Sequence, residues 1–280
     1  MPVRLQLAAL ASIVLLGACG DGSRVSIDSR FAVSGPIHVV IEADEATVML
    51  APSVEGAVIV TGSIDPDRYS YDAAFDGRIV RIELLRERSL LALVQSGTAE
   101  VRARVPPGSS YEIVASATGV TVEAGEFASG SIETSKAAVV VRGGDYSLQV
   151  RNRNASVSIS GQHGPLDVVT TSAAVDVVGH SGGLVAITTN DAPIEYTGTV
   201  EAGGAIELTT TNAHIVVRVV GDASFTIDAA TTNGSISSRY AIIDLERTPT
   251  ELRGRIASGD GSLQLRTTNG SIEVLSASFP

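Results

Sequence analysis

The sequence predicts an all-β protein, most of which forms a single-stranded β-solenoid (β-helix) with coils of about 18 residues. The first observation is a turn phrase, Thr232-Asn233-Gly234-Ser235-Ile236, which returns as Thr268-Asn269-Gly270-Ser271-Ile272. With its weaker copies, the phrase places the following residues at one turn position: Lys136, Asn154, Ser172, Asn190, Asn212, Asn233 and Asn269. The first four lie 18 residues apart, the next two intervals are 22 and 21, and the last is 36, or two periods. Such periods are typical of stacked units.

The second observation is a glycine turn halfway through each period, at Gly164, Gly182, Gly204 and Gly261. One unit therefore reads strand, Asn turn, strand, Gly turn. The third observation is strict alternation, as in Leu263-Gln264-Leu265-Arg266-Thr267, which puts aliphatic residues on one face of a strand. Such short strands bury that face when each pairs in register with its copy one period away. We then expect a polar ladder along one edge, made by Asn154, Ser172, Asn190, Asn212, Asn233 and Asn269.

The N-terminal segment predicts export. Arg4 precedes an apolar run that ends in Leu16-Gly17-Ala18-Cys19, and Cys19 is the only cysteine in the chain. This ending resembles the lipobox of bacterial lipoproteins, which implies cleavage before Cys19 and its acylation. Residues 1–18 are then a lipoprotein signal peptide, and 19–30 a flexible tether. The alternative is an ordinary signal peptide with a chance cysteine. Gly20 takes the place of the aspartate that retains lipoproteins in the inner membrane, which favours the outer membrane.

Residues 31–115 are rich in predicted strands but lack the 18-residue period, and the predicted strand 101–105 stops at Pro106-Pro107-Gly108. We interpret this region as a β-rich cap, or as irregular first coils, and residues 116–280 as the repeats. Residues 237–258 interrupt the pattern and are expected to replace one coil and bulge outward. A formal net charge of −11 argues against nucleic acid as a partner.

Three features of the sequence resemble sites of chemistry. Gly179-His180-Ser181-Gly182-Gly183 matches the nucleophile elbow of serine hydrolases, but no helix is expected after it. His163 and His180 are expected to be exposed turn residues without a nearby carboxylate, so neither is expected to bind a metal. Ser258-Gly259-Asp260-Gly261 is a single copy of a calcium-type turn and is expected to be only a turn. No cofactor and no catalytic residue are expected.

A polysaccharide-acting β-helix enzyme, either a lyase or a hydrolase, is the main alternative function. Such enzymes gather carboxylates with Arg or Lys on one outer face. Here the expected outward carboxylates are spread one per coil; they are Asp167, Asp176, Glu195, Glu207 and Glu273. The densest basic spot, Arg151-Asn152-Arg153, has no clear acidic partner in the sequence. The pattern favours a non-catalytic role.

The strand-rich N-terminal part, the step Val105-Pro106-Pro107-Gly108 and the Thr-Thr-Asn-Gly repeats resemble the DUF4097 "putative adhesin" family. The resemblance covers nearly all of the chain after Cys19 and implies a β-solenoid exported to, or tethered at, a bacterial surface. The family supplies no catalytic residues. We therefore expect a lipid-anchored, adhesin-like binding or structural module of the cell envelope, facing the periplasm or the exterior. Its expected partners are the membrane, through Cys19, and an envelope protein or glycan.

Overall fold

The computed structural model describes residues 24–87, 99–116 and 118–277, and these residues form strands and connections with no helix. The all-β prediction is confirmed. The predicted signal peptide and Cys19 lie outside the described residues. No described helix is long and apolar enough to cross a membrane.

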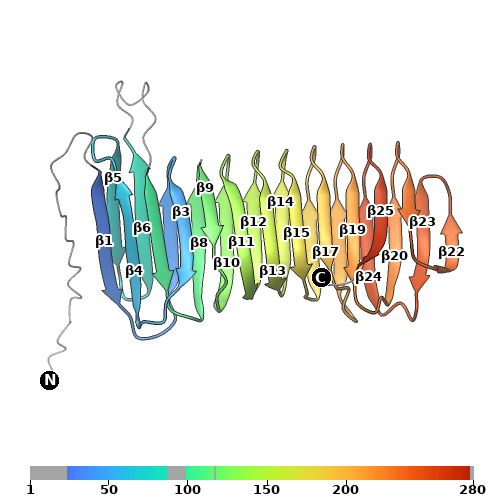
Figure 1. Ribbon diagram of the computed structural model, residues 1–280, viewed down its shortest axis with the longest axis horizontal. Helices are drawn as coiled ribbons and strands as arrows, with labels where there is room; N and C mark the ends of the chain where they lie inside the picture. Colours follow the sequence, from blue (N-terminus) through green and yellow to red (C-terminus); the bar gives the residue numbers. More distant parts are fainter. Residues whose placement is uncertain (1–23, 88–98, 117, 278–280) are drawn as a thin grey trace, which may run out of the picture.

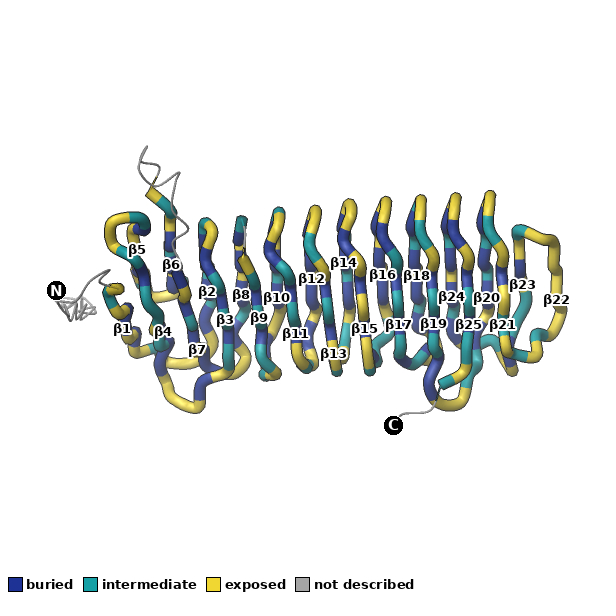
Figure 2. Tube along the Cα trace, turned by 45° about the horizontal axis from the view of Figure 1, so that its top comes forward, coloured by how far each residue is buried: buried dark blue, intermediate teal, exposed yellow. Residues whose placement is uncertain are grey.

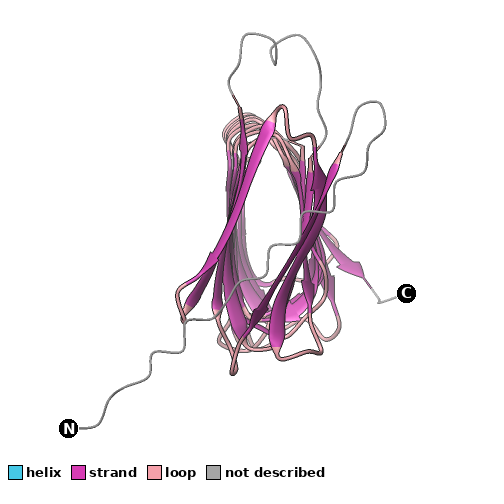
Figure 3. Cartoon of the chain, turned by 90° about the vertical axis from the view of Figure 1, so that its left-hand side faces the viewer, coloured by secondary structure: helices cyan, strands magenta, loops and turns pink. Residues whose placement is uncertain are grey.

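The strands make two long sheets that face each other (Figures 1 and 3). Sheet A contains, in spatial order, β1 (Val25–Ala32), β4 (Ala57–Ile64), β7 (Glu100–Val105), β3 (Thr47–Pro52), β9 (Gly119–Val122), β11 (Ala138–Asp145), β13 (Val157–His163), β15 (Val175–His180), β17 (Ile194–Gly198), β19 (Ile215–Val220), β25 (Ile272–Ala277) and β21 (Ile236–Ser238). Sheet B contains β22 (Ile243–Arg247), β23 (Glu251–Ile256), β20 (Phe225–Ala230), β24 (Gly261–Arg266), β18 (Ala205–Thr209), β16 (Leu184–Thr188), β14 (Leu166–Thr170), β12 (Ser147–Asn152), β10 (Phe127–Thr134), β8 (Ser109–Ala115), β2 (His38–Ala43), β6 (Ile79–Arg86) and β5 (Tyr69–Phe75).

From β8 to β19 the chain alternates between the sheets, and each strand from β8 to β17 pairs in parallel with the strand two places later. In sheet A, Val139 lies opposite Val157, and Val157 lies opposite Val175, which is the 18-residue interval of the sequence. All three valines are buried. Buried residues, in dark blue, recur along the strands of both sheets in Figure 2. Burial of each such aliphatic side chain contributes roughly 1.5–3 kcal/mol to the free energy of folding, relative to leaving it exposed. Residues one period apart therefore share one continuous core.

The C-terminal strands do not follow chain order. β24 lies between β18 and β20, and β25 lies between β19 and β21. The coil made by residues 261–277 is thus inserted between two coils that precede it in the sequence. The segment 237–258 was expected to replace one coil and bulge outward. It instead extends sheet B and closes its end: β23 pairs antiparallel with β20, and β22 pairs antiparallel with β23.

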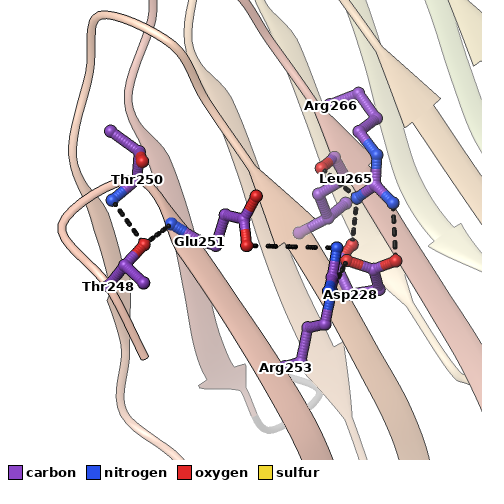
Figure 4. A network of polar contacts seen from close by, with 7 residues as sticks. All are labelled: Asp228, Thr248, Thr250, Glu251, Arg253, Leu265 and Arg266. Atoms are coloured by element: carbon purple, nitrogen blue, oxygen red, sulfur yellow. Dashed lines mark hydrogen bonds and ion pairs between the residues drawn. The ribbon is translucent and has the colours of Figure 1, made fainter. Parts of the chain in front are cut away.

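A charged network joins this hairpin to the inserted strand (Figure 4). Arg266 of β24 donates from Nη2 to Oδ2 of Asp228 on β20 at 2.6 Å and from Nη1 to the Asp228 carbonyl at 2.7 Å. Arg253 of β23 donates from Nε to Asp228 Oδ1 at 3.2 Å. Partial burial acts to raise the pKa of Asp228, but the hydrogen bonds from the two arginines outweigh this effect and hold the pKa below its usual value. One carboxylate therefore joins three neighbouring strands.

The N-terminal end is closed in a similar way. β2 lies between β8 and β6, and β3 lies between β9 and β7, so the first coil is also inserted between later segments. Antiparallel pairs of β1 with β4 and of β5 with β6 finish the two sheets. The tether expected over 19–30 ends sooner, because β1 begins at Val25 and buries Ile27, Ser29 and Phe31 on its inward face.

An inner row of polar side chains fixes the Asn turns. Two residues before the turn position, or one residue before it at Asn190, lies a buried Thr or Asn, and most of these side chains donate to a backbone carbonyl of a turn. Thr170 Oγ1 donates to the Ala173 carbonyl at 3.0 Å, and Thr210 Oγ1 donates to the Ala192 carbonyl at 3.1 Å. Thr189 Oγ1 is buried without a partner among the described residues. The first Thr of the repeat phrase therefore has a structural role.

The inserted C-terminal coil predicts a specific disulfide. In a Cys19→Ser background, Ala205→Cys with Ser262→Cys should cross-link, because these residues lie directly opposite on β18 and β24. Ala205→Cys with Thr226→Cys should not, because β24 separates them and two strand spacings amount to about 9.6 Å, beyond disulfide reach. Non-reducing electrophoresis and peptide mass mapping measure both. Cross-linking of the second pair alone would mean that the coils stack in chain order.

The inner row predicts opposite effects for two similar substitutions. Thr170→Val should lower the free energy of unfolding by about 1 kcal/mol, since it removes one buried hydrogen bond. Thr189→Val should cause no loss, because its hydroxyl is already unpaired. Urea denaturation of the two variants beside the wild type tests this, and equal losses would contradict it.

Candidate binding surface

The residues at the Asn-turn position form an exposed row along one edge of the two sheets. Asn212 Nδ2 donates to Asp191 Oδ1 at 2.6 Å, Asn269 Nδ2 donates to Asn212 Oδ1 at 2.6 Å, and Asn233 Nδ2 donates to Asn269 Oδ1 at 2.7 Å. Asn190 Nδ2 donates to Asp191 Oδ2 at 2.8 Å. Asn269 lies between Asn212 and Asn233, as the inserted coil requires. We call these residues, with Asn154 and Ser172, the Asn-turn row.

The other two members are placed less closely together. Asn154 Nδ2 donates to the carbonyl of Ser135 at 3.5 Å, and the backbone N–H of Ser172 donates to the carbonyl of Arg153 at 2.8 Å. No side-chain hydrogen bond joins Asn154 to Ser172 among the described residues. Side-chain contacts therefore link the row from Asp191 to Asn233, and Asp191 is a member that the sequence alignment on the turn residue missed.

Glycine follows Asn in two of these turns because the backbones of neighbouring coils nearly touch there. A Cβ at Gly270 would overlap the carbonyl oxygen of Ala213, and a Cβ at Gly234 would overlap that of Gly270. The Asn-Gly pair is thus required where three turns are stacked tightly, at the coils of Asn212, Asn269 and Asn233.

The outward carboxylates are less dispersed than the sequence indicated. Asp176 of β15 lies directly opposite Glu195 of β17, and Arg218 of β19 donates to Glu195 Oε2 at 3.0 Å. Partial burial raises the pKa of Asp176, the adjacent Glu195 raises it further, and Arg218 acts against both. On sheet B, Arg151 donates to Asp167 at 3.2 Å, so Arg151 does have an acidic partner. Pairing between coils brings together residues that are distant in sequence.

His180 was expected at the surface, and this prediction is wrong. Its side chain is fully buried, with Nε2 3.0 Å from the carbonyl of Gly164 and Nδ1 2.9 Å from the hydroxyl of Tyr196. Because a carbonyl only accepts, Nε2 carries the hydrogen and Nδ1 accepts from Tyr196. Burial lowers the pKa of His180, and the hydrogen bond to Gly164 opposes this in part. Burial therefore favours the neutral imidazole over the charged one.

A glycine in the left-handed region explains the error. Gly179 has φ 70° and Gly161, 18 residues earlier, has φ 63°; each shifts the alternation by one residue. The next side chain then points inward, which is Gln162 after Gly161 and His180 after Gly179. The glycine repeated 18 residues apart was the sequence signal that could have predicted this shift of the inward face. His163, by contrast, is exposed, and its Nδ1 contacts the hydroxyl of Ser181.

The segment Gly179–Gly183 connects β15 to β16, and Ser181 makes an isolated parallel bridge with His163. Without a strand-to-helix turn, the Ser181 hydroxyl has no nucleophile elbow. In the described part of the chain, no group of three or more His, Cys, Asp or Glu side chains is arranged to hold a metal ion.

Comparison with known proteins gives no family assignment: no family model and no curated protein matches the chain. Among solved structures, one named "putative adhesin" from Bacteroides fragilis has a TM-score of 0.48 at 11% identity, over 90% of this chain and 97% of its own. One named "putative cell adhesion protein" from Clostridium sporogenes has a TM-score of 0.36 at 6% identity, over 90% of this chain and 100% of its own. A "putative adhesin" from Parabacteroides merdae has a TM-score of 0.34 at 9% identity, over 91% of this chain and 98% of its own. All three TM-scores are below 0.5, so function is argued from the chain itself.

The buried histidine predicts a pH dependence of stability. The folded-state pKa of His180 is below the value of about 6.5 in the unfolded chain. As the pH falls through 6.5 the unfolded state therefore binds the proton first, and stability decreases until the folded-state pKa is reached. The wild type should thus lose more free energy of unfolding than His180→Gln between pH 7.5 and 5.5, measured by urea denaturation. His214→Gln is the control, because His214 is exposed and does not contribute to the pKa shift of His180, and it should behave like the wild type. Identical pH profiles for all three would contradict the prediction.

Proposed function

We propose that the chain is a lipid-anchored β-solenoid of the bacterial cell envelope that acts without catalysis, as an adhesin-like binding or structural module. The observation that carries this proposal is the Asn-turn row. It presents amides and a carboxylate at the same position of successive coils, so it offers the same hydrogen-bonding groups at each step. An extended partner, either a protein strand or a glycan, could be held along such a row.

The solenoid interpretation is supported by the alternation of strands between the sheets and by the parallel register at one period. In this interpretation residues 31–115 form the N-terminal cap and residues 116–280 the coils. The antiparallel strands at both ends support it further, because a stack of coils needs closing strands to avoid open edges.

The anchor is proposed from the sequence. Leu16-Gly17-Ala18-Cys19 resembles a lipobox, and a triacylated Cys19 would hold the chain stably in a membrane. Only a few residues separate Cys19 from β1 at Val25, so the N-terminal end of the sheets would stay near the membrane and the other end would extend away from it. An outer-membrane location, facing the periplasm or the exterior, is part of the same proposal.

One observation favours the alternative function, a polysaccharide-acting enzyme. Asp176 and Glu195 are adjacent carboxylates with Arg218 beside them, and the raised pKa of Asp176 is a property of catalytic acids. Structural ion pairs also shift pKa values, and Glu195 is already paired with Arg218. The binding role therefore remains the proposal.

Capture from intact envelopes tests the proposal. The full chain, cross-linked in cells and purified, should retain one envelope protein or glycan, and Asn212→Ala combined with Asn269→Ala should reduce its recovery about tenfold by removing two groups of the row. Gln149→Ala combined with Gln264→Ala, on the outward face of sheet B, is the matched control. Cys19→Ser should move the protein from the membrane fraction to the soluble fraction. Retention of the partner by the first variant, or glycan cleavage abolished by Asp176→Asn or Glu195→Gln, would contradict the proposal.

A further inference from the structure

A cleft lies at the N-terminal end, on the edge opposite to the Asn-turn row. It is formed where three connections meet: residues 33–37 between β1 and β2, 76–78 between β5 and β6, and 106–108 between β7 and β8. Its volume is about 680 Å³. Clefts of this size are typical of sites for small molecules.

Backbone hydrogen bonds hold the walls of the cleft in place. The N–H of His38 donates to the carbonyl of Arg78 at 3.3 Å, and the N–H of Ser110 donates to the carbonyl of Ile37 at 3.0 Å. The N–H of Ile37 donates to the Ser109 hydroxyl at 3.1 Å. Gly35 and Gly77 lie in the lining, and no atom lies within 4 Å of where their Cβ would be. The cleft is thus preformed and open.

Arg78 gives the cleft a positive group. Its guanidinium is exposed and makes no ion pair or side-chain hydrogen bond among the described residues, in a chain with a net charge of −11. In the nearby carboxylate of Asp76, Oδ1 accepts from the N–H of Arg78 at 2.9 Å and of Ile79 at 2.8 Å, so this oxygen is directed at the backbone and away from the guanidinium. These hydrogen bonds hold the pKa of Asp76 low. A planar guanidinium left free in this way matches a carboxylate of a ligand.

The remaining lining supplies neutral hydrogen bonds and apolar surface. Nδ1 of His38 lies 2.8 Å from the hydroxyl of Ser110, which fixes two polar groups at the wall. Pro36 and Phe75 contribute apolar surface, and the ring of Phe75 is held against Phe31 with centroids 6.2 Å apart. Hydroxyl-binding groups beside apolar surface are suited to a sugar ring, whose two kinds of surface they complement.

Glu112 lies 4.0 Å from Nε2 of His38, so Ser110, His38 and Glu112 are in the order of a hydrolytic triad. An oxyanion hole near Ser110 would need free backbone N–H groups. The N–H groups of Ser110 and Gly108 donate instead to the carbonyls of Ile37 and Glu126, and that of Ser109 to Pro106. The arrangement therefore suits binding better than acyl transfer.

We propose that this cleft binds a saccharide unit that carries a carboxylate, with the carboxylate on Arg78 and the ring beside His38, Ser110, Pro36 and Phe75. The site is separate from the Asn-turn row and does not depend on the function proposed for that row.

Two matched sugars test the site: methyl glucuronide and methyl glucoside, which differ in the carboxylate. Each is titrated into the full chain while backbone amide NMR signals are followed. Methyl glucuronide should shift the signals of Gly35, Gly77 and Gly108 saturably, and methyl glucoside should bind at least about tenfold more weakly. Arg78→Gln should weaken glucuronide binding about tenfold, and Arg78→Lys should weaken it less, because it keeps the charge but loses the planar fork.

Arg81→Gln is the control, because Arg81 lies on the same strand, outside the cleft lining, and also makes no side-chain ion pair among the described residues. It should leave binding unchanged. The proposal is overturned if no saturable shift occurs, if the two sugars bind equally, or if Arg81→Gln weakens binding as much as Arg78→Gln. Binding of inorganic phosphate at the same signals, as tightly as glucuronide, would likewise overturn it by revealing a general anion site.

Discussion

Parallel pairing of each coil with its two neighbours is the constraint on which the rest of this structure depends. Neighbouring strands must lie about 4.8 Å apart, so residues one period apart meet directly and must be compatible in size and polarity. Val139, Val157 and Val175 satisfy this in the core. The same rule aligns Asn212, Asn269 and Asn233 at the surface, and it requires glycine where successive turn backbones nearly touch. The matched valines of the core, the Asn-turn row and the placement of glycine therefore all follow from the spacing between neighbouring strands.

The two ends show how such a stack is closed. At the C-terminal end the chain passes the position of a later coil, forms antiparallel strands, and then returns to fill the gap with β24 and β25. At the N-terminal end β2 and β3 are laid down early, and the later strands β6, β7, β8 and β9 then pair on both sides of them, while antiparallel strands finish the sheets. An open parallel edge would expose unpaired N–H and C=O groups to another chain. At the C-terminal end the outermost strand of sheet B, β22, is short and charged and carries Asp244 at a positive φ of 52°, and a bulge interrupts its pairing. These features discourage further strand addition, while Asp228 ties the hairpin to the inserted strand.

Most of the polar side chains buried among the described residues lie near the turns, where they bind backbone. The inner Thr row donates to turn carbonyls, and His180 and Gln162 contact carbonyls near the glycine turns. Tyr111 and Tyr146 pair through their hydroxyls at 3.0 Å and pack edge to face with Phe127. These hydrogen bonds spare the donors the cost of burial without a partner, although Oε1 of Gln162 is buried unpaired among the described residues. Thr189 is an exception and shows that one turn keeps the repeated residue without its hydrogen bond.

The sequence by itself determined the strands, the period and the inward face, because alternation and repeated turn residues are local patterns. It also gave the exposed Asn positions. Only the tertiary structure decided the order of the coils, since two near-identical turn phrases are compatible with either neighbour and the antiparallel hairpins select one. The burial of His180 depended on a left-handed glycine, and the contact of Asp176 with Glu195 depended on register between coils. The Arg78 cleft joins three connections that are distant in sequence, so no local pattern could reveal it.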